Sequence, residues 1–175
     1  MSLKLVSLNG DFYKDIYNWR SDPVTTKYNP VVLHTFEEFS KKMDTLSSNL
    51  EELYSGKDFK WAIVKDNILL SHVSLKEVNA MMKTASIGYQ VNPKYRNQGI
   101  GLQSVYLLVS TVFAKTNIRK LTASIADENV GSYKIVEKIG FKQEGLLRKH
   151  YIINEQEVDE RFYGIFRHEL VTSIM

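Results

Sequence analysis

Cysteine is absent from the 175 residues of this chain, and proline and glycine are sparse, at three and nine residues. The absence of cysteine excludes a disulfide framework, a catalytic thiol and a thiolate metal site. The four histidines stand far apart and lack the spacing of metal ligands, so we expect no metal. So little proline and glycine leaves no room for a low-complexity linker, and no internal repeat is visible. The prediction is one domain over residues 1–175.

Long apolar runs are also missing. No segment approaches the ~20 apolar residues of a membrane-spanning helix. The first residues, Met1 to Lys4, are not followed by the apolar core of a signal peptide. We therefore expect a soluble, cytoplasmic protein without a membrane partner.

The formal net charge is only +3, but its distribution is uneven. Residues 94–149 contain ten Lys/Arg against four Asp/Glu, whereas the rest of the chain contains thirteen against sixteen. Such an excess indicates either a solvated basic face or an affinity for a polyanion, which is a nucleic acid or a phosphorylated cofactor. Charge alone does not choose between them.

The spacing of apolar residues predicts a succession of strands and helices. Strands are expected at Lys4–Leu8, Phe59–Lys65, Leu69–Val78, Thr84–Val91, Leu121–Ala126, Gly145–Ile153 and Val158–Phe166. Helices are expected at residues 11–20, from 36 to about 53, from 99 to about 113, and at 129–139.

Local signals set the ends of the early helices. Pro23 stops the first helix, because the residue before a proline is pushed out of the helical region, and a loop is expected at residues 25–34. Thr35 and Glu38 fit a capping box for the second, which Gly56 ends. The order is strand, two helices, three strands, helix, strand, helix and two strands, which is typical of an α/β domain with a mixed central sheet. The helix from Gly99 and the strand after it should make a right-handed crossover.

A glycine-containing turn joins the strand ending at Val91 to the amphipathic helix from Gly99. Unpaired amides at a helix start, the helix dipole, and the charges of Lys94 and Arg96 together suit a pyrophosphate. The alternative is a tight turn that merely needs its glycines. Neither a Walker loop nor a G-x-G-x-x-G dinucleotide fingerprint is present.

A second segment, Asn129-Val130-Gly131-Ser132-Tyr133-Lys134-Ile135-Val136-Glu137-Lys138-Ile139-Gly140-Phe141, follows one crossover later. Together with the R-x-x-G-x-G of residues 96–101, it resembles the GNAT superfamily of N-acetyltransferases. The chain is most similar to the branch of the ribosomal-protein N-terminal (RimJ/RimL-like) and spermidine acetyltransferases. The resemblance implies an α/β GNAT-like fold: a mostly antiparallel sheet of about seven strands with one splayed parallel pair, flanked by four helices.

The resemblance also implies acetyl-CoA as co-substrate, without a metal. The pantetheine arm would lie between the strands ending at Val91 and Ala126. The cofactor would contact Tyr89, Gln90, Val91, Arg96, Asn97, Gln98, Gly99, Ile100, Gly101, Asn129, Ser132 and Lys138. Three of these have simpler explanations: Asn129 as a helix N-cap, Ser132 as a capping residue, and Lys138 as a cation at a helix C-terminus.

For catalysis the resemblance implies two roles. The amide of Val91 would stabilise the oxyanion, and Ser132 would contact the leaving sulfur. Many relatives carry a tyrosine acid where this chain has Val136, and a glutamate where it has Ser86. The base is therefore open among His72, Glu77, Asp127, Glu128 and a water chain.

The expected function is direct acetyl transfer to a primary amine, which is a protein N-terminus, ribosomal or other, or a small amine. Residues named for the acceptor side are Trp19, Tyr28, His34, Tyr151 and Tyr163. A homodimer is compatible with the resemblance. The alternatives are a catalytically silent acyl-CoA sensor and a basic nucleic-acid-binding module, the latter disfavoured because no nucleic-acid motif is present.

Overall fold

The computed structural model describes residues 2–30, 32 and 34–174. Among these residues are seven strands in one sheet: β1 Lys4–Ser7, β2 Phe59–Lys65, β3 Ile68–Asn79, β4 Thr84–Val91, β5 Lys120–Ala126, β6 Lys142–Ile153 and β7 Gln156–Phe166. The α-helices of the same residues are α1 Tyr13–Arg20, α2 Pro23–Tyr28, α3 Phe36–Asp44, α4 Ile100–Lys115 and α5 Val130–Ile139. None of the described helices is long and apolar enough to cross a membrane.

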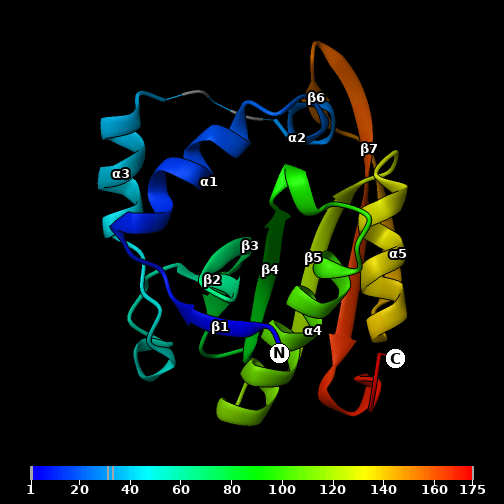
Figure 1. Cartoon of the computed structure of the whole chain (residues 1–175). Helices are drawn as coiled ribbons and strands as arrows, with labels where there is room; N and C mark the ends of the chain where they lie inside the picture. Colours follow the sequence, from blue (N-terminus) through cyan, green and yellow to red (C-terminus); the bar gives the residue numbers. More distant parts are fainter. Residues whose placement is uncertain (1, 31, 33, 175) are drawn as a thin grey trace.

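The strands lie in the order β1-β2-β3-β4-β5-β7-β6, and β4 with β5 is the one parallel pair among them (Figure 1). The other neighbours are antiparallel. The chain goes from β4 through α4 to β5, which is the expected crossover. The mixed, mostly antiparallel sheet of seven strands predicted from the sequence is confirmed.

Helices cover both faces of the sheet. Because successive side chains of a strand point to opposite faces, Trp61 and Ile63 of β2 belong to the core under α4 and α5, whereas Ala62 packs with α1 and α3. Val105 and Val112 of α4 are fully buried in the first core. Burial of such a side chain contributes about 1.5–3 kcal/mol, so α4 is firmly fixed to the sheet.

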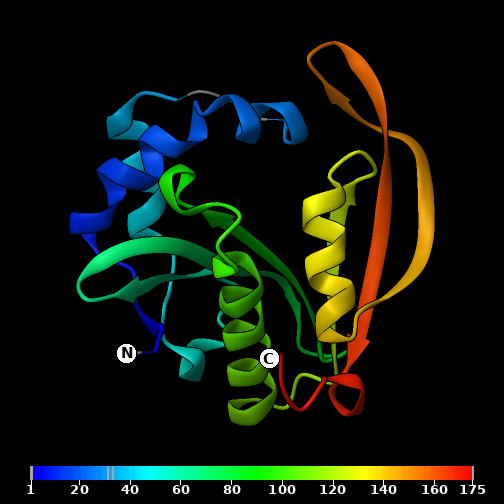
Figure 2. The ribbon, with the colours of Figure 1, turned by 45° about the vertical axis from the view of Figure 1, so that its right-hand side comes forward.

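The β6–β7 hairpin projects beyond the rest of the sheet (Figure 2). The register of β6 against β7 shifts between Leu147 and Tyr151, where β6 has extra residues. Such a bulge bends and twists a strand. The far end of β6 thereby comes into contact with α2.

Two helix predictions were wrong. Pro23 begins a helix, α2, within residues expected to form a loop, so five α-helices rather than four flank the sheet in the described part of the chain. Proline is well tolerated at the first helical position, where its missing N–H has no partner to lose. The side chain of Asp22 caps this helix by accepting a hydrogen bond from the amide of Thr25.

The helix expected from residue 36 to about 53 ends at Asp44. Thr45 stops it, because both its amide and its hydroxyl donate to the carbonyl of Lys42. The leucines beyond continued the helical spacing, but Leu50 and Leu53 pack in the other core, with Phe59. The apolar spacing of residues 36–53 therefore matched one helix, although Leu50 and Leu53 pack against the opposite face of the sheet.

Candidate active site

The site begins where β4 and β5 separate. They pair only from Thr84 to Ser86 of β4 with Lys120 to Thr122 of β5, and their remaining residues diverge (Figure 1). The amide of Asn92 donates to the carbonyl of Leu70 in β3. Since successive peptide groups of a strand point to opposite sides, the N–H groups of Tyr89 and Val91 point toward β5, into the gap.

A cavity of about 800 Å³ occupies this gap. Every residue predicted to contact the cofactor lines this cavity except Gln98. The side-chain amide of Gln98 donates a hydrogen bond to the carbonyl of Lys94. The lining residues from that prediction are Tyr89, Gln90, Val91, Arg96, Asn97, Gly99, Ile100, Gly101, Asn129, Ser132 and Lys138. Three segments far apart in the sequence therefore meet around one cavity, which is large enough for a small-molecule ligand.

Two glycines shape the start of α4. Gly99, just before the helix, has a left-handed φ of 75°, which favours glycine. A Cβ on Gly101 would lie 2.9 Å from Cδ1 of Ile135 and 3.4 Å from Cγ2 of Val91. A side chain at this position would require at least Ile135 to shift, so glycine allows the helix to pack closely against β4 and α5. Because the first N–H groups of a helix have no partner within it, the close packing leaves donors at the edge of the cavity.

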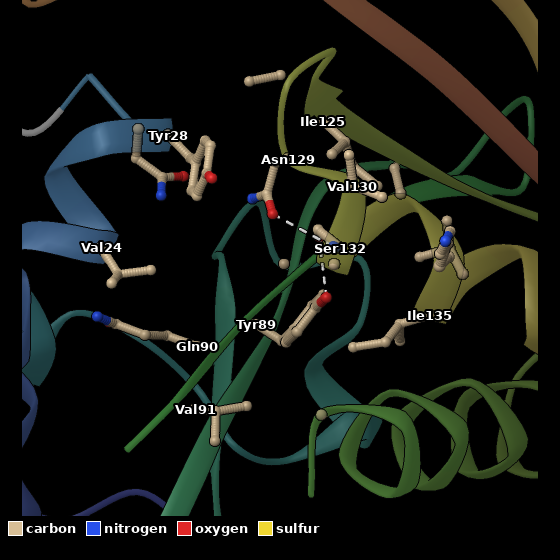
Figure 3. A pocket seen from close by; sticks show the side chains of 18 of the residues that line it. Val24, Tyr28, Tyr89, Gln90, Val91, Ile125, Asn129, Val130, Ser132 and Ile135 are labelled. Carbon is tan, nitrogen blue, oxygen red and sulfur yellow. Dashed lines mark hydrogen bonds between the residues drawn. The ribbon is translucent and has the colours of Figure 1, made fainter. Parts of the chain in front are cut away.

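The hydroxyl of Tyr89 lies 2.9 Å from that of Ser132, so β4 and α5 are joined across the cavity by a hydrogen bond (Figure 3). Burial raises the pKa of Tyr89 to about 12, although the hydrogen bond with Ser132 acts in the opposite direction. Tyr89 therefore remains protonated at neutral pH. The sequence pointed to its main chain only, because no local pattern relates residues this far apart.

Asn129 is the N-cap of α5, as the simpler of its two explanations predicted. Its side-chain oxygen accepts a hydrogen bond from the amide of Ser132, at 3.2 Å, so it caps the helix (Figure 3). This cap fixes the turn that carries the Ser132 hydroxyl. One turn further along, Val136 is fully buried.

The Arg96 side chain is bound to the protein itself. Nη2 of Arg96 lies 2.6 Å from Oδ2 of Asp22 and 3.2 Å from Oγ1 of Thr25. Burial would raise the pKa of Asp22, but hydrogen bonds from Arg96 and from the Thr25 amide outweigh it and lower this pKa below its usual value. Arg96 thus joins the turn before α4 to the start of α2.

The other end of the cavity is bounded by Tyr28 of α2, Glu128, and Tyr151 of β6. The Tyr151 hydroxyl donates to Oε1 of Glu160 at 3.0 Å, and Nε2 of His150 lies 3.3 Å from Oε2. Glu160 is only 3% exposed and is the one buried carboxylate among the described residues. Burial and the charge of Glu160 raise the pKa of Tyr151, which keeps its proton. Sequence reasoning missed Glu160, because an alternating strand pattern does not reveal a buried carboxylate.

The other residues named for the acceptor side lie elsewhere. Trp19 is buried in the core with α1 and α3, and the hydroxyl of the buried Tyr163 donates to Glu137. His34 does not line the cavity, and its carbonyl accepts from Tyr17. Of the five aromatic residues and histidines named for the acceptor side, only Tyr28 and Tyr151 line the cavity.

Two of the candidate bases are already engaged. His72 is buried, and its Nε2 lies 3.0 Å from Oε1 of Gln90. Burial, and then the nearby Lys60 charge, lower its pKa well below the usual value, so its ring is neutral. Asp127 is paired with Arg161. Glu128 lines the cavity, whereas Glu77 is exposed outside its lining.

Residues 3–142 match the family described as the acetyltransferase (GNAT) domain. The chain belongs to the GNAT acetyltransferase family. It is 28% identical to the probable N-acetyltransferase YjcK of Bacillus subtilis over 94% of this chain and 86% of the relative. It is 25% identical to the ribosomal-protein-serine acetyltransferase of Escherichia coli over 73% of this chain and 70% of the relative. The Vibrio cholerae spermidine N-acetyltransferase, solved with CoA and spermine, has the same fold: TM-score 0.83, 19% identity, covering 96% of this chain and 97% of that one.

These matches confirm the branch inferred from the two motifs, and the protein is an acetyltransferase. The family match over residues 3–142 covers the N-terminal helices and the turn before α4 as well as the end of α5.

Proposed function

We propose that the enzyme transfers an acetyl group from acetyl-CoA directly to a primary amine. The observation that carries the proposal is the gap between β4 and β5, where N–H groups of Tyr89 and Val91 face a cavity bounded by the Gly99–Gly101 turn. An extended pantetheine arm can pair with such an open strand edge, as a peptide does in strand addition. The solved relatives with bound CoA or acetyl-CoA support this donor.

Groups around the cavity match the negative charge of coenzyme A. The amides at the start of α4 would hold the pyrophosphate, assisted by the helix dipole, because Gly101 lets the backbone lie close. Lys138, which lines the cavity from α5, would neutralise a phosphate. Part of the basic excess of residues 94–149 is then explained without a nucleic acid.

When bound, acetyl-CoA supplies the thioester carbonyl that the amine attacks. The amide of Val91 donates to the carbonyl oxygen as negative charge develops on it. Ser132 donates its proton to the sulfur as the carbon–sulfur bond breaks, and Tyr89 replaces that proton through the 2.9 Å hydrogen bond. The second proton, which the attacking nitrogen loses on becoming an amide, passes to water, and water restores the proton of Tyr89. Ser132 alone would be a poor acid, whereas a phenol is a stronger acid than an aliphatic hydroxyl even with its pKa raised to about 12.

The amine must be neutral to attack, although model amine pKa values are about 8 to 10. We assign its proton to Glu160, through Tyr151. The Tyr151 oxygen accepts a proton from the ammonium while its own proton passes to Oε1 of Glu160, along the existing 3.0 Å bond. A buried carboxylate bonded to a phenol and an exposed histidine also attracts a cation to this end of the cavity.

The acceptor class is a protein N-terminus or a small amine, as in the relatives named for ribosomal proteins and for spermidine. The test is an acceptor panel with acetyl-CoA: spermidine, peptides beginning with serine or alanine, an aminoglycoside and an amino sugar. Free thiol release is followed together with the mass of the acceptor. Transfer to at least one amine is expected. Tight coenzyme binding without transfer would instead indicate a silent acyl-CoA sensor, and an absence of coenzyme binding would overturn the proposal.

A further inference from the structure

Helix α2 forms a wall of the cavity at its acceptor end, yet none of its side chains is buried. A helix of six residues is far too short to be stable on intrinsic propensity alone. Apolar burial, which fixes most helices, is therefore not what holds α2. Its position depends on polar contacts with other elements.

The first set of contacts converges on Asp22, the N-cap of α2. Its Oδ2 accepts hydrogen bonds from the amide of Thr25 at 3.0 Å, from the Thr25 hydroxyl at 3.3 Å, and from Nη2 of Arg96 at 2.6 Å. The side chains of Arg96 and Asp22 are 24% and 17% exposed. An ion pair withdrawn from water to this extent is stronger than a surface pair.

The second set comes from Gln90 of β4. Its amide nitrogen donates to the Thr25 hydroxyl oxygen and to the Trp19 carbonyl, both at 3.0 Å. Its oxygen accepts from Nε2 of the neutral His72, at 3.0 Å. His72 thereby fixes which way the Gln90 amide is turned. The Thr25 hydroxyl oxygen thus accepts hydrogen bonds from both Gln90 and Arg96. Gln90 lies in β4, and Arg96 lies in the loop that follows this strand.

We propose that the Arg96–Asp22 pair is a latch that transmits the state of the cofactor loop, residues 96–101, to α2. In this role Arg96 is a positioning residue rather than a phosphate ligand. The inference rests on the proposed acetyl-CoA site. If Arg96 turned to a phosphate, Asp22 would be a largely buried carboxylate without its cation, which is unfavourable. Arg96 instead keeps this partner while its main chain belongs to the loop.

The consequence is coupling between the two ends of the cavity. A coenzyme that orders the loop restricts the backbone of Arg96 and so favours the geometry in which its guanidinium holds Asp22. Helix α2, which carries Tyr28 at the acceptor end, becomes more rigid. Binding of the donor therefore prepares the wall that meets the acceptor.

Hydrogen exchange followed residue by residue tests the latch without knowledge of the acceptor. Coenzyme A is the probe, and wild type is compared with Arg96→Gln and with Asp22→Asn, in which asparagine still caps the helix. In wild type, coenzyme A should slow exchange at residues 97–101 and also at 24–28. In either variant the loop should still be protected, whereas α2 should exchange about fivefold faster and respond little to coenzyme A.

Protection of α2 by coenzyme A to the same extent in the variants as in wild type would overturn the latch. An unprotected loop in wild type would overturn the proposed cofactor site instead. Hydrogen exchange of wild type and Arg96→Gln without coenzyme A would then still decide whether Arg96 holds α2. Equal exchange rates of α2 in these two proteins would overturn that role too. Two variants at opposite ends of the same pair guard against a folding defect in one.

Calorimetry separates the latch from a phosphate contact. Arg96→Gln should keep the coenzyme A dissociation constant within about threefold and leave its salt dependence unchanged, whereas Lys138→Ala should weaken binding and flatten that dependence. The double variant of Arg96→Gln and Asp22→Asn should resemble either single variant, because the two residues act as a unit. A loss above about tenfold with a flatter salt dependence in Arg96→Gln, but not in Asp22→Asn, would make Arg96 a phosphate ligand and refute the proposal.

Discussion

The hydroxyl groups of Tyr89 and Ser132 meet at 2.9 Å, although 43 residues separate them in the sequence. One comes from β4 and the other from the first turn of α5, and the splayed gap lies between these elements. In the proposed mechanism this pair supplies the proton that Val136 cannot. The leaving sulfur would then be protonated without a tyrosine from the last helix.

Ser132→Ala and Tyr89→Phe should each lower kcat while leaving coenzyme affinity nearly unchanged. A hydrogen bond made mainly to developing thiolate stabilises the transition state more than the ground state. We expect a loss on the order of 1.5–3 kcal/mol, roughly ten- to a hundredfold in rate. Single-turnover acetyl transfer is the measurement, and the double variant should lose little more than the worse single variant.

Val136→Ala serves as the packing control for this pair. It removes fully buried methyl groups from the same helix without touching either hydroxyl. A loss of rate equal to that of Ser132→Ala would mean that distorted packing, rather than the hydroxyl, explains both variants. A Ser132→Ala rate within about twofold of wild type would leave Ser132 no role at the sulfur.

The raised pKa of Tyr89 makes a second, independent prediction about stability. Between pH 10 and about 12 the tyrosine ionises in the unfolded chain but keeps its proton in the native one. The unfolded state then binds fewer protons, so the free energy of unfolding falls as pH rises through this window. Denaturant unfolding at pH 9 and pH 11 should show a smaller fall for Tyr89→Phe than for wild type. Equal falls would mean that the pKa of Tyr89 is not raised in the native protein above its value in the unfolded chain.

Gly101→Val should abolish coenzyme A binding and leave the fold largely intact. The Cβ alone would lie 2.9 Å from Cδ1 of Ile135 and 3.4 Å from Cγ2 of Val91, and the two further methyl groups need more space, so we expect the first turn of α4 to be displaced. Calorimetry with coenzyme A measures the loss, and circular dichroism checks the fold. Gly10→Ala is the control, since an added Cβ there meets nothing within 4 Å. Unchanged affinity in a folded Gly101→Val protein would disprove the loop assignment.

The sequence predicted the sheet, the crossover and a set of cofactor residues of which all but Gln98 line the cavity, because those features depend on local periodicity and on motifs with fixed spacing. It failed where tertiary contacts decide. The helix after Thr35 was extended to Leu53 because leucines that pack in a different core continued its spacing. The ion pair of Arg96 with Asp22, 74 residues away, was not anticipated, because a cation in a loop carries no sign of its partner.

The acceptor end was the least predictable part for the same reason. Glu160 lies in an alternating strand segment, and only the bulged register of β6 brings Tyr151 onto it. Two of the aromatic residues expected there, Trp19 and Tyr163, are buried in the core instead. Aromatic side chains near a site cannot be divided into lining and core by sequence pattern, because both fates follow from the same apolar spacing.

Glu160→Gln should reduce acetyl transfer most strongly at neutral pH and progressively less as the pH rises. An amide cannot take the proton that Tyr151 passes on, so the amine must lose it to water instead. Loss of such a base costs about 10²- to 10⁴-fold. Above the amine pKa of about 8 to 10 the acceptor is neutral without help, and the deficit should shrink. Tyr151→Phe should show the same pH trend, because it interrupts the same path.

The measurement is kcat/KM for the acceptor between pH 6.5 and 9.5, with Glu157→Gln as the matched control, since Glu157 is exposed on the same hairpin and pairs with Lys149. A deficit of Glu160→Gln that is constant across this range would show that the carboxylate only shapes the cavity, and the proton would then have to leave by water or through Glu128.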